Sequence, residues 1–167
     1  MTTSSGTTRI TTPTDDRILI TRELAAPPAL VYRAWTTPEL VKRWWSGGHG
    51  PVTVAEIDLR VGGTWRYVIA GDGYEVAFHG EYREIVPDER LVFTEIFEGA
   101  PETPDVPASD PPVDIVTFAP APGGGTTLTM LVECHTKELR DLILDSGMEA
   151  GVQGQMEALE AVAAALT

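Results

Sequence analysis

The sequence DSGMEAGVQGQMEALEAVAAAL, residues 145–166, is the long stretch of this chain that has clear helical periodicity. Its apolar residues recur at spacings of three and four, which places them in one stripe along a helix. They are Met148, Val152, Met156, Leu159, Val162 and Leu166. Ser146 followed by Glu149 has the pattern of a capping box, in which each side chain binds a free backbone N–H group of the first turn. We therefore predict a helix of about 30 Å over residues 147–166.

Most of the chain before this helix has the pattern of β-strands. Short apolar stretches are separated by glycine-rich turns, such as Gly62-Gly63 and Gly123-Gly124-Gly125. We expect seven strands, over residues 17–24, 52–61, 64–70, 74–86, 90–97, 113–119 and 126–135. Gly80 lies inside the fourth of these and marks a bulge or a sharp bend. Because consecutive strands joined by short turns pair antiparallel, and the helices are kept apart from them, we predict an α+β domain.

Proline residues mark the starts of two short helices after the first strand. Pro27 and Pro28 suit the first turn of one helix, and Thr37-Pro38 has the pattern of an N-cap and first residue of the next. Residues 137–145 are expected to form another short helix before the long one. Residues 98–112 hold five prolines and four acidic residues without periodicity, so this segment is either a functional lid or a mobile loop.

The charge balance limits the partners of the protein. The 167 residues suit one domain with a sizeable core, and 12 basic against 25 acidic residues give a net charge of −13. Such a charge argues against a nucleic-acid partner and against binding to anionic membrane surfaces. The chain also lacks both a run of about 18 apolar residues and an apolar signal region near its start.

The ends of the chain and its cysteine content suggest its organisation and compartment. Residues 1–16 are mostly Thr, Ser and Gly, so we expect a disordered tail before a single domain over residues 17–167. The single cysteine, Cys134, permits no intrachain disulfide and favours a reducing compartment. We therefore expect a cytoplasmic protein.

Four segments of the chain together carry a family resemblance. They are PPALVYRAWTTPELVKRWW at 27–45, EIDLRVGGTWRYV at 56–68, HGEYREIVPDERLVFT at 79–94 and SGMEAGVQGQMEALEAVAAAL at 146–166. Their motifs occur in the order found in bacterial Hsp90-ATPase-activator-homologue-like (AHSA1-type) proteins, which the chain resembles over about residues 17–166. That family belongs to the START/Bet v 1-like (SRPBCC) superfamily. Members often have an aromatic residue soon after the glycine near the start of the last helix, where this chain has Val152 and Gln153.

The resemblance implies a helix-grip fold, in which a curved seven-stranded antiparallel sheet wraps around the long C-terminal helix. In the superfamily, the space between sheet and helix holds hydrophobic ligands. The departure at Val152 and Gln153 would enlarge or reshape such a cavity. The family name records homology to a eukaryotic co-chaperone domain, which by itself does not establish a contact with Hsp90.

Aromatic and apolar side chains are the expected lining of this cavity. On the strands, Trp65 and Tyr67 share one face, as do Phe78 and Tyr82. The candidate ligand-binding residues are Trp44, Trp65, Tyr67, Phe78, Tyr82, Phe93, Glu95, Phe97, Met148, Val152 and Met156. The alternative for any one of them is an ordinary place in the core. Gly151 and Gly154 would leave room beside the sheet, which predicts a cavity wall along the N-terminal half of the last helix.

Glu95 is the candidate for acid–base chemistry. It falls in the same alternation as Phe93 and Phe97, so it can point inward, where burial would raise its pKa; the alternative is a rim or outward-facing carboxylate. His79 alternates away from Phe78 and is expected on the solvent side. We assign no catalytic residue, no metal ligand and no cofactor, because the sequence has no nucleophile elbow, phosphate loop or zinc-ligand spacing.

Three functions fit this sequence. The first is a cytoplasmic binding protein whose cavity takes a small hydrophobic or aromatic molecule. The second is a protein-interaction module, for instance with a chaperone, which would need an exposed apolar patch. The third is a cyclase- or hydrolase-type enzyme that uses a carboxylate in the cavity. A homodimer is also conceivable through edge strands or the aromatic-rich helices.

Overall fold

The computed structural model describes residues 8–47, 50–71, 73–98, 111–145 and 148–166. Within these residues the chain forms one antiparallel sheet, four α-helices and one short 3-10 helix. The strands are β1 (Arg9–Thr11), β2 (Arg17–Leu24), β3 (Val52–Ile57), β4 (Thr64–Gly71), β5 (Tyr74–Val86), β6 (Arg90–Thr94), β7 (Ile96–Glu98), β8 (Val113–Pro120) and β9 (Thr126–Glu133). The helices are α1 (Pro28–Thr36), α2 (Pro38–Trp44), η1 (Pro122–Gly124), α3 (Lys137–Asp145) and α4 (Met148–Ala164).

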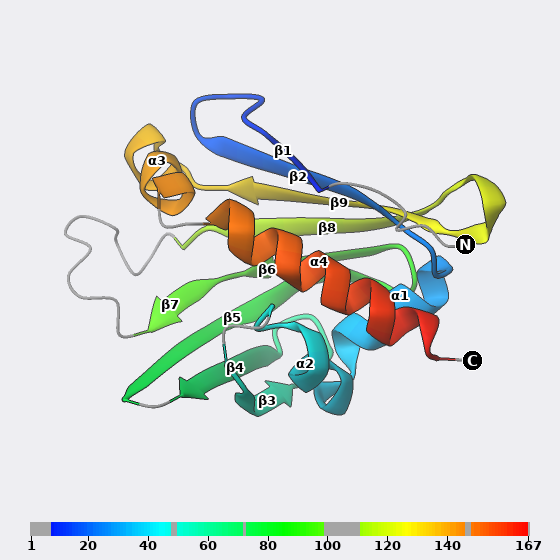
Figure 1. Ribbon diagram of the computed structural model, residues 1–167. Coiled ribbons are helices and arrows are strands. Elements are labelled where there is room, and N and C mark those ends of the chain that lie inside the picture. Colours follow the sequence, from blue (N-terminus) through cyan, green and yellow to red (C-terminus); the bar gives the residue numbers. More distant parts are fainter. Residues whose placement is uncertain (1–7, 48–49, 72, 99–110, 146–147, 167) are drawn as a thin grey trace.

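The sheet curves around α4, which lies across its concave face (Figure 1). The strands follow the order β1-β2-β9-β8-β6-β5-β4-β3, and β7 pairs with β5 beside this path. All the recorded pairs are antiparallel. The helices α1 and α2 pack against α4 and also contact β8 and β3, respectively. This is the α+β helix-grip architecture that the sequence predicts.

The apolar stripe of α4 faces the sheet, as predicted. Val152, Met156, Leu159 and Val162 are all buried. Tertiary packing of such a stripe, at about 25 cal/mol for each Å² of apolar surface removed from water, stabilises a helix more than its intrinsic propensity does. The predicted cap at Ser146 lies outside the described residues. No helix in the described parts of the chain, α4 included, has the length and apolar content needed to cross a membrane.

The described residues form nine strands, two more than the sequence predicts. One of the two arises because residues 90–97 divide into β6 and β7. The cause lies on β5, where a Cβ atom at Gly80 would be 1.7 Å from the Thr94 carbonyl oxygen. Only glycine permits so close an approach of two backbones. The irregularity predicted at Gly80 is therefore confirmed, and it separates the part of β5 that pairs with β7 from the part that pairs with β6.

The second additional strand is β1, which lies within the segment expected to be a disordered tail. Residues 9–11 pair with residues 19–21 of β2 and form one edge of the sheet. A strand of three residues, surrounded by threonines, is too short to show a period of two in the sequence. The backbone N–H of Thr8 donates to Gln153 Oε1 at 3.2 Å, so this segment is attached to α4 as well. Residues 1–7 of the predicted tail lie outside the described residues.

A buried ion pair connects β2 to α4. Arg22 is 2% exposed, and its Nη2 atom lies 3.3 Å from Glu160 Oε1. Its Nη1 atom donates to Thr8 Oγ1 at 3.1 Å, and the second oxygen of Glu160 accepts the backbone N–H of Ala25 at 2.8 Å. These directional contacts fix the rotation of α4 about its own axis, which apolar packing alone defines less strictly.

Candidate functional site

A small void lies between the sheet and the first two helices. Its volume is about 20 Å³, which is enough for one water molecule. Its lining residues are Trp35, Trp45, Trp65, Tyr67, Tyr82, Phe93, Glu95 and Met130. The wall thus combines α1, the residue that ends α2, and side chains from β4, β5, β6 and β9. Six of the eight lining side chains are aromatic, so the void is mainly apolar.

Two carboxyl groups form a polar side of this site. Glu95, in the link between β6 and β7, borders the void, and Asp114 of β8 is 2% exposed. Burial raises the pKa of Glu95, and a hydrogen bond with Asp114 limits that rise. Burial, the charge of Glu95 and the same hydrogen bond raise the pKa of Asp114 well above its ordinary value. Because burial favours the neutral form of both groups, and two carboxyl groups can hydrogen-bond to each other only when one of them carries a proton, the pair shares at least one proton.

Two tyrosines and a thiol complete the polar groups of this region. The hydroxyl groups of Tyr67 and Tyr82 hydrogen-bond to each other, and burial is the main cause that raises the pKa of both. Cys134 is 1% exposed, and burial together with the charges of Asp114 and Asp16 raises its pKa to about 11. At neutral pH the two hydroxyls and the thiol are thus all protonated, and the thiol is no nucleophile.

A series of aromatic rings leads from the void to the protein surface. The Trp45 ring lies 5.1 Å from that of Tyr67 and 4.8 Å from that of Phe78, in edge-to-face contacts. Phe78 in turn stacks on Phe97 at 4.9 Å, and Phe97 is 46% exposed. Phe97 therefore marks the outer end of a continuous aromatic path into the site.

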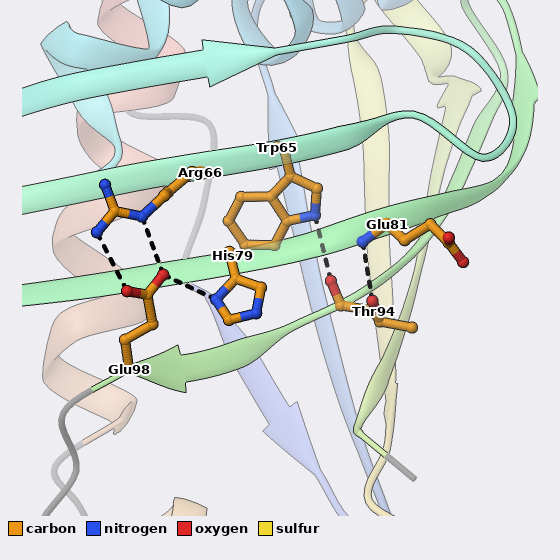
Figure 2. Close-up of polar contacts among 6 residues, drawn as sticks. All are labelled: Trp65, Arg66, His79, Glu81, Thr94 and Glu98. Carbon is orange, nitrogen blue, oxygen red and sulfur yellow. Dashed lines mark hydrogen bonds and ion pairs between the residues drawn. The ribbon is translucent and has the colours of Figure 1, made fainter. Parts of the chain in front are cut away.

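Polar contacts fix β7 at the edge of the site (Figure 2). Glu98 accepts two hydrogen bonds from Arg66, at 3.0 and 3.1 Å, and contacts His79 Nδ1 at 2.8 Å. These partners, Arg66 first, lower the pKa of the Glu98 carboxyl group. Arg66 and His79 alternate with the inward-facing Trp65 and Phe78, so the cluster lies on the outer face of the sheet. The predicted solvent-side position of His79 is confirmed, since its side chain is 41% exposed.

Thr94 fixes the chain just before Glu95. Its carbonyl oxygen accepts the Trp65 Nε1–H at 3.2 Å, and its hydroxyl accepts the backbone N–H of Glu81 at 2.9 Å (Figure 2). The backbone N–H of Glu95 itself donates to the Pro112 carbonyl oxygen at 3.0 Å. The break between β6 and β7 is thus held on both sides, and it directs the Glu95 side chain to the void.

The structure brings together part of the predicted ligand-binding set. Five of these residues border the void, namely Trp65, Tyr67, Tyr82, Phe93 and Glu95. Phe78 and Phe97 lie outside it, on the aromatic path to the surface. Trp44 is not in the lining: its Nε1–H donates to the Ala34 carbonyl oxygen at 3.0 Å, and its ring packs 4.9 Å from that of Trp35. Trp44 therefore holds α1 and α2 together.

The N-terminal half of α4 does not border this void. Val152 and Met156 are buried in the core and Met148 is packed against it, but none of the three is in the lining. A Cβ atom at Gly154 would lie 2.6 Å from the carbonyl oxygen of Gly47, which follows α2. The prediction that Gly154 leaves open space beside the sheet is therefore wrong, because the backbone after α2 already occupies that space.

Four site residues are absent from the predicted ligand-binding set. Trp35 lies on the apolar face of the first short helix and Trp45 at the end of the second, and Met130 lies in a strand without a strict alternation. Asp114 had a usable signal, because it alternates with Val116 and Phe118, both buried on the inner face of β8. An acidic residue in step with inward apolar residues on a central strand indicates a buried carboxyl group.

The site offers hydrogen-bond donors and acceptors at one side of an aromatic pocket. A carboxyl pair that shares a proton can bind a polar group or exchange a proton with it. In the described parts of the chain, no cluster of three or more His, Cys, Asp or Glu residues could hold a metal ion.

Comparisons with known proteins agree on the family and fold. The family model described as "Activator of Hsp90 ATPase homolog 1-like protein" matches residues 25–164. A crystal structure of a Rhodobacter sphaeroides protein is 25% identical, with a TM-score of 0.85 over 96% of this chain and 100% of that chain. A Mycobacterium smegmatis protein is also 25% identical, with a TM-score of 0.81 over 97% and 99% of the two chains. The AHSA1-like protein of Aeromonas hydrophila shares the fold, at 22% identity and a TM-score of 0.66 over 89% and 92% of the two chains. Among curated proteins, no match is found.

Proposed function

The chain belongs to the family of Activator of Hsp90 ATPase homolog 1-like proteins, and on this premise we propose that it binds a small, mainly aromatic or apolar molecule between α2 and the sheet. The family supports a ligand-binding or interaction module in general, and the site residues favour the first of these. The observation that carries the proposal is the aromatic path from Phe97 to the void, with Glu95 at its inner end. A mainly apolar pocket with a few placed polar groups is the usual form of a small-molecule site.

A ligand larger than one water molecule requires the site to widen. The rings of Trp45, Phe78 and Phe97 are the side chains whose movement would widen it, because they lie between the void and the surface. Trp45 directly follows α2, and its carbonyl oxygen accepts a hydrogen bond from Gln155 of α4, so the backbone there is attached to α4. We therefore place the movement in the three side chains, with the backbones of α2 and the sheet as fixed walls.

The test is a thermal-shift screen with neutral, cationic and anionic aromatic compounds. A true ligand at 100 times its Kd stabilises the native state by about 2.7 kcal/mol, which for a domain of this size is a rise in Tm of roughly 5–10 °C. A hit should also shift the indole N–H signals of Trp45 and Trp65 in NMR spectra, while that of Trp44 stays in place. If no aromatic compound meets both criteria, the proposal fails.

Enzymatic activity is a second candidate, because a specific observation favours it. The half-buried Glu95 and the buried Asp114, which share a proton, have the arrangement of an acid–base pair. An exposed Glu95 would have removed this alternative. If turnover of a bound compound is found, Glu95→Gln should abolish it while leaving the Tm within a few degrees. Turnover that survives this substitution would exclude the carboxyl pair from the chemistry.

The remaining expectations about context are proposals as well. We place the protein in the cytoplasm, because its single cysteine suits a reducing compartment. A protein partner would use the large apolar side chains that are exposed among the described residues. These are Leu59, Val61, Tyr74, Phe97 and Leu142, which come from four separate parts of the chain. Pull-down of a chaperone, or a dimer in analytical ultracentrifugation, would support such an interaction.

A further inference from the structure

We propose that the Glu95–Asp114 pair is the recognition point for a protonated amine, carried by the aromatic ligand of this site. This inference rests on the proposed binding function and adds the chemical class of the ligand to it. It follows from three features of the described residues. The acid pair has no basic side chain beside it, the neighbouring aromatic rings suit a cation, and the void has a matching size.

The carboxyl pair has no basic partner among the described residues. The ion pairs that involve Lys and Arg there join other acids, among them Glu160, Glu98 and Asp141. Arg140 lies near Cys134, whose pKa its charge lowers, but its guanidinium group donates hydrogen bonds to Asp141 and to the Thr14 carbonyl oxygen. A buried carboxylate without a cation is costly, and it is stabilised most by an opposite charge in hydrogen-bonding contact. A ligand ammonium group would supply that charge.

The surroundings of Glu95 suit an organic cation. Trp45, Trp65 and Tyr67 border the same void, and the faces of such rings attract an ammonium group. The void holds one water-sized group, which is close to the size of a primary ammonium head. An ammonium group bound there would replace one of its hydrogen bonds to water by a hydrogen bond to the Glu95 carboxylate. The apolar part of the ligand would extend toward Phe78 and Phe97.

The same arrangement disfavours the competing ligand classes. A carboxylate or phosphate ligand would place a second negative charge beside Glu95, in a site where like charges repel strongly. A neutral alcohol can accept a hydrogen bond from a protonated carboxyl group or donate one to a carboxylate, but it adds no positive charge to balance that carboxylate. We therefore expect the order amine, alcohol, acid for probes that share one aromatic body.

Benzylamine, benzyl alcohol and benzoate form the matched probe set for this order. Each is titrated into the full chain at pH 7.5 and 0.15 M salt, where surface attraction to a chain of net charge −13 is partly screened. The indole N–H signals of Trp45 and Trp65 in NMR spectra report on the site itself. We expect benzylamine to bind at least tenfold more tightly than benzyl alcohol, and benzoate to cause no shift of these signals.

Three variants locate the preference. Glu95→Gln should bring the affinities for benzylamine and benzyl alcohol within twofold of each other. Asp114→Asn should retain the amine preference, because the Asn amide can still donate to the Glu95 carboxylate. Glu89→Gln, which removes the same charge from an exposed turn residue, should change nothing. Both buried substitutions keep the side-chain shape and remove a buried acid, so the fold should survive, which circular dichroism verifies.

The possible failures are distinguishable from one another. If benzyl alcohol binds the wild type as tightly as benzylamine, the amine inference is wrong and the proposed binding function stands. An amine preference that persists in Glu95→Gln, or that Glu89→Gln removes, would assign it to the surface charge and overturn the inference. If Glu95→Gln weakens both probes equally, Glu95 is not a cation site. If no probe shifts the two indole signals, the inference fails and the proposed function loses its support at this site.

Discussion

The burial of Asp114 and Glu95 couples the stability of the protein to pH. In the native state, the pKa of Asp114 lies above its ordinary value of 3.8, and that of Glu95 lies above its ordinary value of 4.5. In the pH window between the ordinary and the raised pKa values, the native state therefore holds more protons than the unfolded chain. The free energy of unfolding therefore falls as pH rises through this window. Tyr67, Tyr82 and Cys134 lie in the same region, and their pKa values are raised above ordinary values that are already alkaline, so these groups do not titrate in this window.

Asp114→Asn tests this coupling. The variant removes one buried ionisable group, so its stability relative to the wild type should increase from pH 5 to pH 8, as urea denaturation at each pH would measure. Glu98→Gln is the control of opposite sign: the pKa of Glu98 is lowered, so its contribution is present above about pH 4.5 and is lost as pH falls. A stability difference for Asp114→Asn that stays constant over this range would contradict a buried carboxyl pair.

Cys134 should be inert in the native protein. Its thiol is 1% exposed, and its pKa of about 11 keeps the thiolate fraction very low at pH 8. We expect no reaction with Ellman's reagent over an hour at pH 8, and one equivalent of thiol after addition of guanidinium chloride. Rapid labelling of the native protein would show that the segment after β9 opens easily.

For single residues, alternation along a strand predicts which face of the sheet a side chain occupies, but it does not predict the neighbours of that side chain. The alternation of Glu95 with Phe93 left an inward and an outward position open, and the structure brings Glu95 to the void. Alternation with Val116 and Phe118 also indicates an inward position for Asp114, but not its contact with Glu95, because contacts between β6 and β8 depend on the sheet order, which one sequence does not reveal. The same holds for Met130, whose approach to the site depends on the position of β9.

Among the elements, α4 and the chain after α2 are in close backbone contact. A Cβ atom at Gly154 would lie 2.6 Å from the Gly47 carbonyl oxygen, so Gly154→Ala forces the two segments apart. The same substitution at an unhindered helix position would stabilise by roughly 1 kcal/mol. We expect instead a loss of about 1–3 kcal/mol, the usual cost of overpacking, measured by urea denaturation. A gain in stability would show that this contact is loose.

The elements themselves were largely predictable, and their exceptions have local causes. The helices and seven of the strands could be predicted, because their apolar periodicity lies within each element and the turn residues lie directly beside it. The division of residues 90–97 could not be predicted, because its cause, the approach of Thr94 to Gly80, joins two strands. The strand β1 was missed because its pairing with β2 provides an order that its three residues do not indicate.

For the whole molecule, the fold and the site differ in how far the sequence determines them. A long amphipathic helix and a run of short antiparallel strands leave few ways to bury both apolar surfaces, so the helix-grip fold follows. The volume of the site depends on how completely side chains from α1, α2 and the sheet fill the space between them. Here Trp35 and Trp45 fill it to about 20 Å³, and no pattern in the sequence shows that degree of filling.

The packing around this void can be tested by enlarging it. Met130 borders the void and Met156 lies elsewhere in the core, so Met130→Ala and Met156→Ala delete the same atoms in two different places. Each substitution should lower the free energy of unfolding, by about 2 kcal/mol at the half-buried Met130 and by more at the fully buried Met156. Only Met130→Ala adds its space to the site. It should therefore bind small aromatic probes such as benzyl alcohol more tightly than the wild type, by roughly fourfold for each methylene-sized gap that the probe fills. Calorimetric titration of both variants measures this difference. If both variants bind the probe equally, the void is not the place where an aromatic ligand enters the protein.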